Sequence, residues 1–269
     1  MNNCLICGHD LEKFAEVESY TILKCSNCGF GQTEKLATQK GSYHRDKTYI
    51  EEENLFKNIF QKRVNKISTF KKNGKALEIG CSTGLMLSLL AQNGWEVLGV
   101  EISKEAVGVA KKRGLEVIEE KFEDAKLNKR FDLIIFNHTL EHLGNPKETL
   151  EKASALLSKE GLLYIDLPNF GALSAKIQKQ NWPLLLPNEH LWHFTLKSLE
   201  IVLGEFGFKI VCVDRSSGIL DYNNPLLGLI RSLFGFKKRF FREFLTAIPS
   251  WIVSKLGVGS DLMVISRKI

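Results

Sequence analysis

The chain has 269 residues, of which 44% are hydrophobic and 25% charged, and its formal net charge is +6. This is the composition of an ordinary globular protein with room for one full-sized domain and a smaller accessory one. No apolar run reaches the roughly 18 residues needed to cross a bilayer, which argues against a transmembrane helix. Because a cysteine motif, rather than a signal peptide, follows the first residues, we expect a cytoplasmic location.

Four cysteines near the start form two CxxC pairs separated by seventeen residues: Cys4, Cys7, Cys25 and Cys28. Two such pairs, each followed by glycine, predict a tetrahedral zinc site without a spare ligand position, and therefore a structural zinc. Two disulfides are the alternative, which a cytoplasmic location disfavours. We assign residues 1–40 to this zinc-ribbon-like module. Cys81 and Cys212 are expected to be buried, unpaired thiols.

A connector and a helix follow over residues 41–74, and the helix shows apolar residues at helical spacing from about 52 to 72. From residue 75 to 269, short apolar runs alternate with helical patterns. Strands are predicted at 77–79, 96–100, 115–118, 131–136, 162–167, 208–213 and 262–267. Helices are predicted at 84–93, 103–114, 145–158 and 195–206, with Ser103 and Thr195 as N-caps and Asn145-Pro146 opening the third helix. The alternation predicts an α/β fold with a doubly wound, mostly parallel, seven-stranded sheet.

The first strand of this domain ends in a glycine-rich turn, Gly80-Cys-Ser-Thr-Gly84, and Glu101 ends the next strand about 20 residues later. A dinucleotide site needs G-x-G-x-x-G, but the second and third glycine positions hold Ser82 and leucine. Glu78, two residues before the first glycine, would repel a pyrophosphate. It suits a ligand that carries an ammonium and a sulfonium group. The alternative is an ordinary strand-turn-helix unit of an α/β protein that binds no ligand.

The pattern Glu-x-Gly-x-Ser-x-Gly resembles motif I of the class I S-adenosylmethionine (SAM) methyltransferases, with Ser82 where the family usually has glycine. The resemblance implies a Rossmann-like domain in which Glu101 holds the ribose hydroxyls of SAM. It also implies an adenine site after the third strand, with Glu123 at the amino group and Phe122 against the ring. A solvated acidic loop is the alternative there. The implied cofactor-binding residues in these segments are Glu78, Gly80, Ser82, Gly84, Glu101, Ile102, Phe122 and Glu123.

The segment Phe131-Asp-Leu-Ile-Ile-Phe-Asn-His-Thr-Leu-Glu-His142 resembles the family's motif IV and the residues after it. It places Asn137 and His138 at the carboxyl end of a central strand, where open α/β sheets bind ligands. The resemblance implies that these two residues hold the methionine end of SAM. Glu141 and His142 pair to order the loop, and His142 is either an orienting residue or a catalytic base.

An aromatic loop with two prolines, residues 182–195, contains Glu189 and His190. A Glu-His pair before the last crossover helix, together with a four-cysteine module, resembles methyltransferases that act on sugars and related metabolites. The resemblance implies acid/base roles for Glu189 and His190, with His138 and His142 as further catalytic candidates. Capping and packing roles for His190 and His193 are the alternative. A lid formed by Tyr43, His44 and Tyr49 is a further expectation.

An insert at about 219–259 precedes the last strand. Its positions 225–258 mix apolar residues with six Lys or Arg and one acid, Glu243. This composition predicts packing or dimerisation first and contact with the inner face of a membrane second.

Together, these patterns predict methyl transfer from SAM to a small-molecule, sugar or glycan acceptor, which includes a lipid-linked one, by in-line displacement. Zn²⁺ is the second predicted cofactor. One alternative is a nucleic-acid or protein methyltransferase recruited by the zinc ribbon. Against nucleic acid, Asn137-His-Thr-Leu140 lacks the two prolines typical of base N-methyltransferases. The other alternative is a non-catalytic scaffold with the methyltransferase fold.

Overall fold

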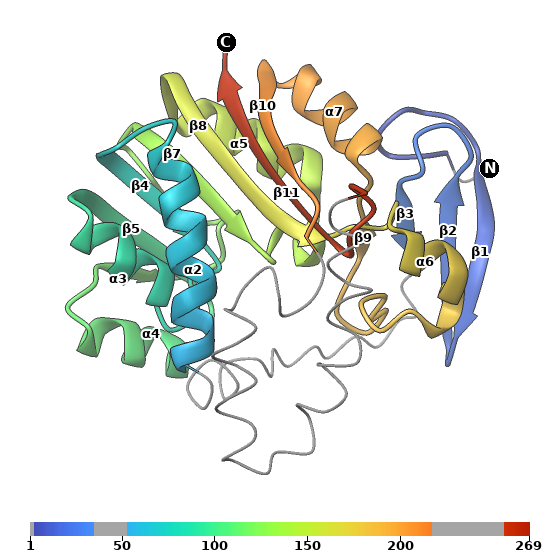
Figure 1. The fold of residues 1–269 in the computed structure, drawn as a ribbon, viewed down its shortest axis with the longest axis horizontal. Helices are drawn as coiled ribbons and strands as arrows, with labels where there is room; N and C mark the ends of the chain where they lie inside the picture. The colour runs from blue at the N-terminus through green and yellow to red at the C-terminus, as the bar shows by residue number, and fades with distance from the viewer. Residues whose placement is uncertain (1–2, 35–52, 217–255) are drawn as a thin grey trace.

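In a computed structural model, the chain forms two β-sheets with flanking helices (Figure 1). The structure describes residues 3–34, 53–216 and 256–269. Across these ranges, no helix is both long and apolar enough to pass through a membrane. The predicted lid residues Tyr43, His44 and Tyr49, and the insert from 219 to 255, lie outside the described residues.

The larger sheet has seven strands in the order β10-β11-β8-β7-β4-β5-β6. In chain order these strands are β4 (Gly74–Ile79), β5 (Trp95–Glu101), β6 (Val117–Glu119), β7 (Phe131–Asn137), β8 (Leu157–Pro168), β10 (Phe208–Asp214) and β11 (Asp261–Lys268). The five strands from β8 to β6 run parallel, and β11 is antiparallel to both of its neighbours. All seven predicted strands are present, so the predicted doubly wound, mostly parallel sheet is confirmed.

Helices cover both faces of this sheet because its central strands carry runs of apolar residues that point to both faces. In β7, the run from Leu133 to Phe136 is fully buried. Helices α2 (Glu53–Ser68) and α3 (Leu85–Gln92) share one apolar cluster with the sheet, and Figure 1 shows α2 in front of it. Helices α5 (Pro146–Leu156) and α7 (Leu196–Glu205) belong to the cluster on the opposite face. Helix α4 (Lys104–Lys112) packs near β6.

Hydrogen bonds confirm the predicted N-caps Ser103 and Thr195, and they show that Asn145 caps the helix predicted to open at Asn145-Pro146. The side chains of Ser103, Asn145 and Thr195 each accept a hydrogen bond from a backbone N–H in the first turn of α4, α5 and α7. Each cap stabilises its helix by about 1 kcal/mol, since it satisfies a donor that the helix leaves unpaired. These local signals fix where the crossover helices start.

Strand β4 lies between β5 and β7, so the chain continues to one side of β4 through β5 and β6 and then crosses to its other side with β7. The carboxyl ends of these three strands, at Ile79, Glu101 and Asn137, therefore come to one edge of the sheet. In open α/β sheets this switch point is where ligands bind. The sheet thus brings the glycine-rich turn and the two predicted donor-binding segments together.

The second sheet has four strands in the order β1-β2-β3-β9, which are β1 (Leu11–Val17), β2 (Tyr20–Cys25), β3 (Gly31–Thr33) and β9 (Trp192–His193). Its last strand comes from the aromatic loop, and Figure 1 shows it beside β3. The Phe30 ring stacks on Trp192 at 5.8 Å, and Thr195 Oγ1 donates a hydrogen bond to the carbonyl of Cys28 at 2.7 Å. The zinc-ribbon-like module is therefore joined to the larger domain by backbone pairing.

Candidate functional site

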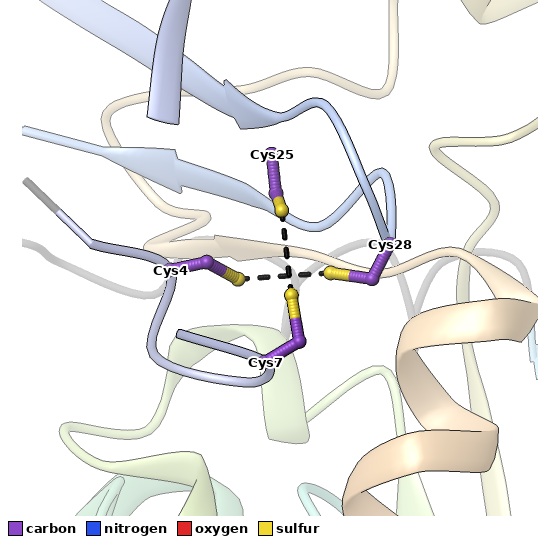
Figure 2. Close-up of side chains that lie close together, drawn as sticks. All are labelled: Cys4, Cys7, Cys25 and Cys28. Carbon is purple, nitrogen blue, oxygen red and sulfur yellow. Dashed lines mark hydrogen bonds between the residues drawn. The ribbon is translucent and has the colours of Figure 1, made fainter. Parts of the chain in front are cut away.

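The four cysteine sulfurs of the N-terminal module point toward a common centre (Figure 2). The Sγ atoms of Cys4 and Cys28 are 3.6 Å apart, and those of Cys7 and Cys25 are 3.5 Å apart. A tetrahedral zinc with Zn–S bonds of about 2.3 Å separates its sulfurs by about 3.8 Å. The donor set and spacing therefore fit Zn²⁺. Beyond this module, Cys81 is buried and Cys212 half-buried, and neither forms a disulfide.

The glycine-rich turn needs backbone angles that side chains resist. Gly80, Ser82 and Gly84 have φ of 69°, 47° and 72°, in the left-handed region. A Cβ on Gly80 would lie 2.7 Å from Thr139, so a side chain is also excluded there by space. Ser82 adopts the conformation for which the family uses glycine, and it does so at a cost in backbone strain.

Glu101 is a nearly buried carboxylate, 9% exposed, that backbone amides hold in place. Its Oε1 accepts hydrogen bonds from the N–H groups of Ile102 and Ser103, and its Oε2 accepts one from Ser82, all at 2.8 Å. A carboxylate offers about four lone-pair positions, so about one remains, on Oε2. Glu101 can therefore accept about one hydrogen bond from the ribose, fewer than the predicted contact with both hydroxyls would need. Ile102 is 47% exposed beside it and offers an apolar surface.

Glu78 lies at the end of β4, only 2% exposed. Burial raises the pKa of Glu78 to about 8, the negative charge of Glu101 adds to the rise, and the positive charge of Arg63 opposes it. Its Oε2 has no hydrogen-bond partner among the described residues. A cationic ligand would favour the ionised form of this carboxyl group, and a role for Glu78 in binding the donor stays a prediction.

A buried ion pair completes this edge of the sheet, and sequence reasoning missed it. Arg63 of α2 pairs with Asp166 at the end of β8, with 2.5 Å between Nη2 and Oδ2. Arg63 Nη1 also donates to Asn137 Oδ1 at 2.8 Å. Both charged side chains are at most 11% exposed. The sequence showed Arg63 only as one of several basic residues in a predicted helix, without a sign of its partner 103 positions away.

On the adenine side, the prediction for Phe122 does not fit the structure. Phe122 is 2% exposed and packs edge-on against Phe136, and the Lys152 ammonium lies 4.8 Å from its ring centroid. A ring enclosed in this way offers no surface for a nucleobase to stack on. The ammonium of Lys152 also stabilises the turn that contains Phe122, because it donates hydrogen bonds to three backbone carbonyls of this turn. Glu123 is exposed at this turn, and its role stays a prediction.

Four histidines lie around one buried carboxylate, Glu141, which is 1% exposed. These histidines are His138, His142, His190 and His193. Glu141 Oε1 lies 3.5 Å from His138 Nδ1 and 4.0 Å from His142 Nε2. The rings of His142 and His190 are 4.8 Å apart. The carboxylate partner of these rings is therefore Glu141. The predicted Glu189 takes part through its backbone carbonyl, which lies 2.9 Å from His142 Nδ1.

Charges inside this cluster oppose the effect of burial. Burial raises the pKa of Glu141, but the close contact with His138 and the charges of the histidines outweigh it and hold that pKa at about 2. Burial lowers the pKa of His138, but Glu141 and Asp166 outweigh it, so the pKa is raised. Burial, with His190 nearby, lowers the pKa of His193 to about 3. Glu141 is thus held ionised, the raised pKa of His138 makes it a stronger proton acceptor, and His193 stays neutral.

Comparison with known proteins agrees with this geometry. Residues 52–213 match the family described as "Methyltransferase domain". The chain is 30% identical to C-methyltransferase NovU of Streptomyces niveus over 51% of this chain and 33% of that protein. It is 30% identical to the ubiquinone biosynthesis O-methyltransferase of Haemophilus ducreyi over 40% of this chain and 52% of that protein. The chain thus spans a third to a half of these relatives.

A solved structure shares the fold. The plantazolicin methyltransferase BamL, in complex with a triazolic desmethylPZN analogue and SAH, superposes with a TM-score of 0.55 at 18% identity. The match covers 82% of this chain and 88% of that one. At this identity the likeness concerns the fold.

Proposed function

This chain belongs to the methyltransferase domain family and is a class I SAM-dependent methyltransferase; from this premise we propose that it methylates a small molecule, with a sugar or glycan as the preferred acceptor. The observation that carries the proposal is the edge of the sheet beside β4. There the Gly80–Gly84 turn meets Glu101, a carboxylate that three amides orient. A turn of small residues lets a ligand approach the backbone closely, and the carboxylate has an oxygen that would accept a ribose hydroxyl.

The reaction is one in-line displacement that moves a methyl group from the sulfonium sulfur of SAM to a nucleophile of the acceptor. The chain contributes mainly alignment, since the sulfonium is already activated. Glu101 and Ile102 would hold the ribose end of the donor. Asn137, together with the buried carboxyl group of Glu78, would hold its methionine end.

We assign the general base to His138, which is needed where the acceptor nucleophile carries a proton. Its side chain is 18% exposed, against 8% for His142 and 1% for the whole of His190. It directly follows Asn137 at the end of β7. Glu141 lies against its Nδ1 and would stabilise the imidazolium that forms when it accepts a proton.

For the N-terminal module we propose one structural zinc at Cys4, Cys7, Cys25 and Cys28. The donor set is four sulfurs, three of them from buried residues, which fill all four tetrahedral positions and leave none for water. The ion would fix the two turns that precede β1 and β3. Because β9 pairs with β3, it would also hold the aromatic loop over the larger domain.

The preference for a sugar or glycan rests on two features. The chain carries a four-cysteine module ahead of the domain, and it is similar to the C-methyltransferase NovU. The test incubates the protein with labelled SAM and three acceptor sets: nucleotide sugars, lipid-linked glycans and bulk RNA. We expect label only in one of the first two sets. Label in RNA alone would refute this acceptor class, and the absence of SAM binding by folded protein would favour a scaffold.

The assignment of the base is tested separately with His138→Gln. We expect kcat to fall by about 10²–10⁴ with an unchanged Kd for SAM, since only proton transfer is lost. His9→Gln, which changes an exposed histidine of the N-terminal module, is the matched control. An unchanged kcat for His138→Gln would show that another group, or none, accepts the proton.

A further inference from the structure

The side chains of Glu141, His142 and His190 converge inside the protein, far along the chain from the cysteine cluster. Their ligand atoms all lie within 4.8 Å of one another. Glu141 and His142 belong to η1 (Leu140–His142), the single turn after β7, and His190 belongs to the aromatic loop. All three are largely buried, with Glu141 and His190 each 1% exposed. Two imidazoles and a carboxylate form a common ligand set for divalent transition metals.

The orientation of both imidazoles favours metal binding. His142 Nδ1 lies 2.9 Å from the carbonyl of Glu189, and His190 Nδ1 lies 3.0 Å from the carbonyl of Leu184. Because a carbonyl only accepts, each Nδ1 carries the hydrogen, and each neutral ring keeps its lone pair on Nε2. Metal-bound histidines are held in this way, with the second nitrogen donating to a backbone carbonyl. The backbone therefore selects the tautomer that binds an ion through Nε2.

The carboxylate of Glu141 supplies an independent observation. Neither of its oxygens has a hydrogen-bond partner among the described residues. Its contacts with His138 Nδ1 and His142 Nε2, at 3.5 and 4.0 Å, are longer than the roughly 2.7–2.9 Å of a charge-assisted hydrogen bond. A buried carboxylate with contacts this long is costly, and an ion among the three residues would satisfy it.

From this geometry we infer a second metal site, in which Glu141, His142 and His190 bind one divalent transition ion such as Zn²⁺. Tetrahedral bonds of about 2.0–2.1 Å need ligand atoms roughly 3.4 Å apart, so the cluster would contract by up to ~1.4 Å on binding. Three protein ligands leave a fourth position open. If the proposed function holds, an acceptor oxygen would take this position, close to the end of β7.

The test counts ions with Co²⁺ as the probe. Chelator-treated full-length protein is reloaded with Co²⁺, and bound metal and absorption are measured together. We expect two ions: one at the cysteines with a thiolate-to-metal charge-transfer band, and one with ligand-field bands only. Glu141→Gln and His142→Gln should each lower the count from two to one and keep the charge-transfer band. That band reports that the chain is still folded around its cysteines.

His193→Gln is the matched control. His193 is a buried neighbour of His190, but its own Nε2 lies 2.9 Å from Thr33 Oγ1 and it is not one of the three proposed ligands. It should still bind two ions. A single Co²⁺ in the unaltered protein, or two in both Glu141→Gln and His142→Gln, would overturn the inference. Should a variant fail to fold, the count in the unaltered protein decides. SAM calorimetry on the same samples keeps this result separate from the proposed function, since metal counting needs no donor.

Discussion

Glu101→Gln tests the donor site at the residue on which it most depends. The substitution keeps the shape but replaces one acceptor oxygen with an NH₂ group. Since Oε1 accepts two backbone N–H groups, the amide oxygen of glutamine should take that place. The NH₂ then faces the N–H of Ser82, donor against donor, at the position left for a ribose hydroxyl.

The expected loss of SAM affinity follows from the one hydrogen bond to the ribose that Glu101→Gln removes. One charge-assisted hydrogen bond to the ribose is worth about 1.5–3 kcal/mol. At 1.4 kcal/mol per tenfold change, the Kd for SAM should rise about 10- to 100-fold. The opposed donors should also lower the free energy of unfolding by about 1–3 kcal/mol.

Calorimetric titration with SAM measures the Kd, and thermal unfolding followed by circular dichroism measures stability. Glu105→Gln is the control, because it removes the same charge from an exposed position in the first turn of α4. It should change neither quantity. If folded Glu101→Gln bound SAM as tightly as the unaltered protein, the donor would have to sit elsewhere and the site described here would be wrong.

Three further substitutions test the same edge of the sheet, and a fourth, Lys71→Met, serves as a control away from it. Arg63→Met leaves Asp166 buried without its partner and should lower the free energy of unfolding by about 3–5 kcal/mol in urea titrations. Lys71→Met, which breaks a more exposed pair, should cost at most about 1 kcal/mol, and equal costs would contradict the role of burial. Because the pKa of Glu78 is raised to about 8, its contribution to stability is present below its ordinary pKa near 4.5 and is lost as pH rises to 8. Glu78→Gln should therefore flatten the fall in stability between pH 5 and 8, and parallel curves would exclude this carboxyl group as the cause. Ser82→Gly relieves a positive φ and should raise stability by about 0.5–1 kcal/mol, measured as a Tm increase of a few degrees; a lower Tm would argue against strain there.

Features that depend on neighbours in the chain could be predicted from the sequence. The glycine-rich turn, the strands around it and the caps at Ser103, Asn145 and Thr195 all follow from short patterns. So do the paired cysteines, because each CxxC closes its own turn. The burial of Phe122 could not be predicted, since a phenylalanine in an acidic stretch fits a ligand surface and a core position equally well.

The sequence alone determined which segments form the strands of the donor site and which residue types stand at its edge, because hydrophobic period and turn chemistry are local properties. Tertiary structure alone decided which distant groups meet. It paired Arg63 with Asp166, added β9 to the cysteine module and brought His190 to Glu141. Such contacts arise when a whole sheet closes around its core, and the energy that selects them is shared among many residues. No short segment carries enough of that energy to reveal the partner in advance.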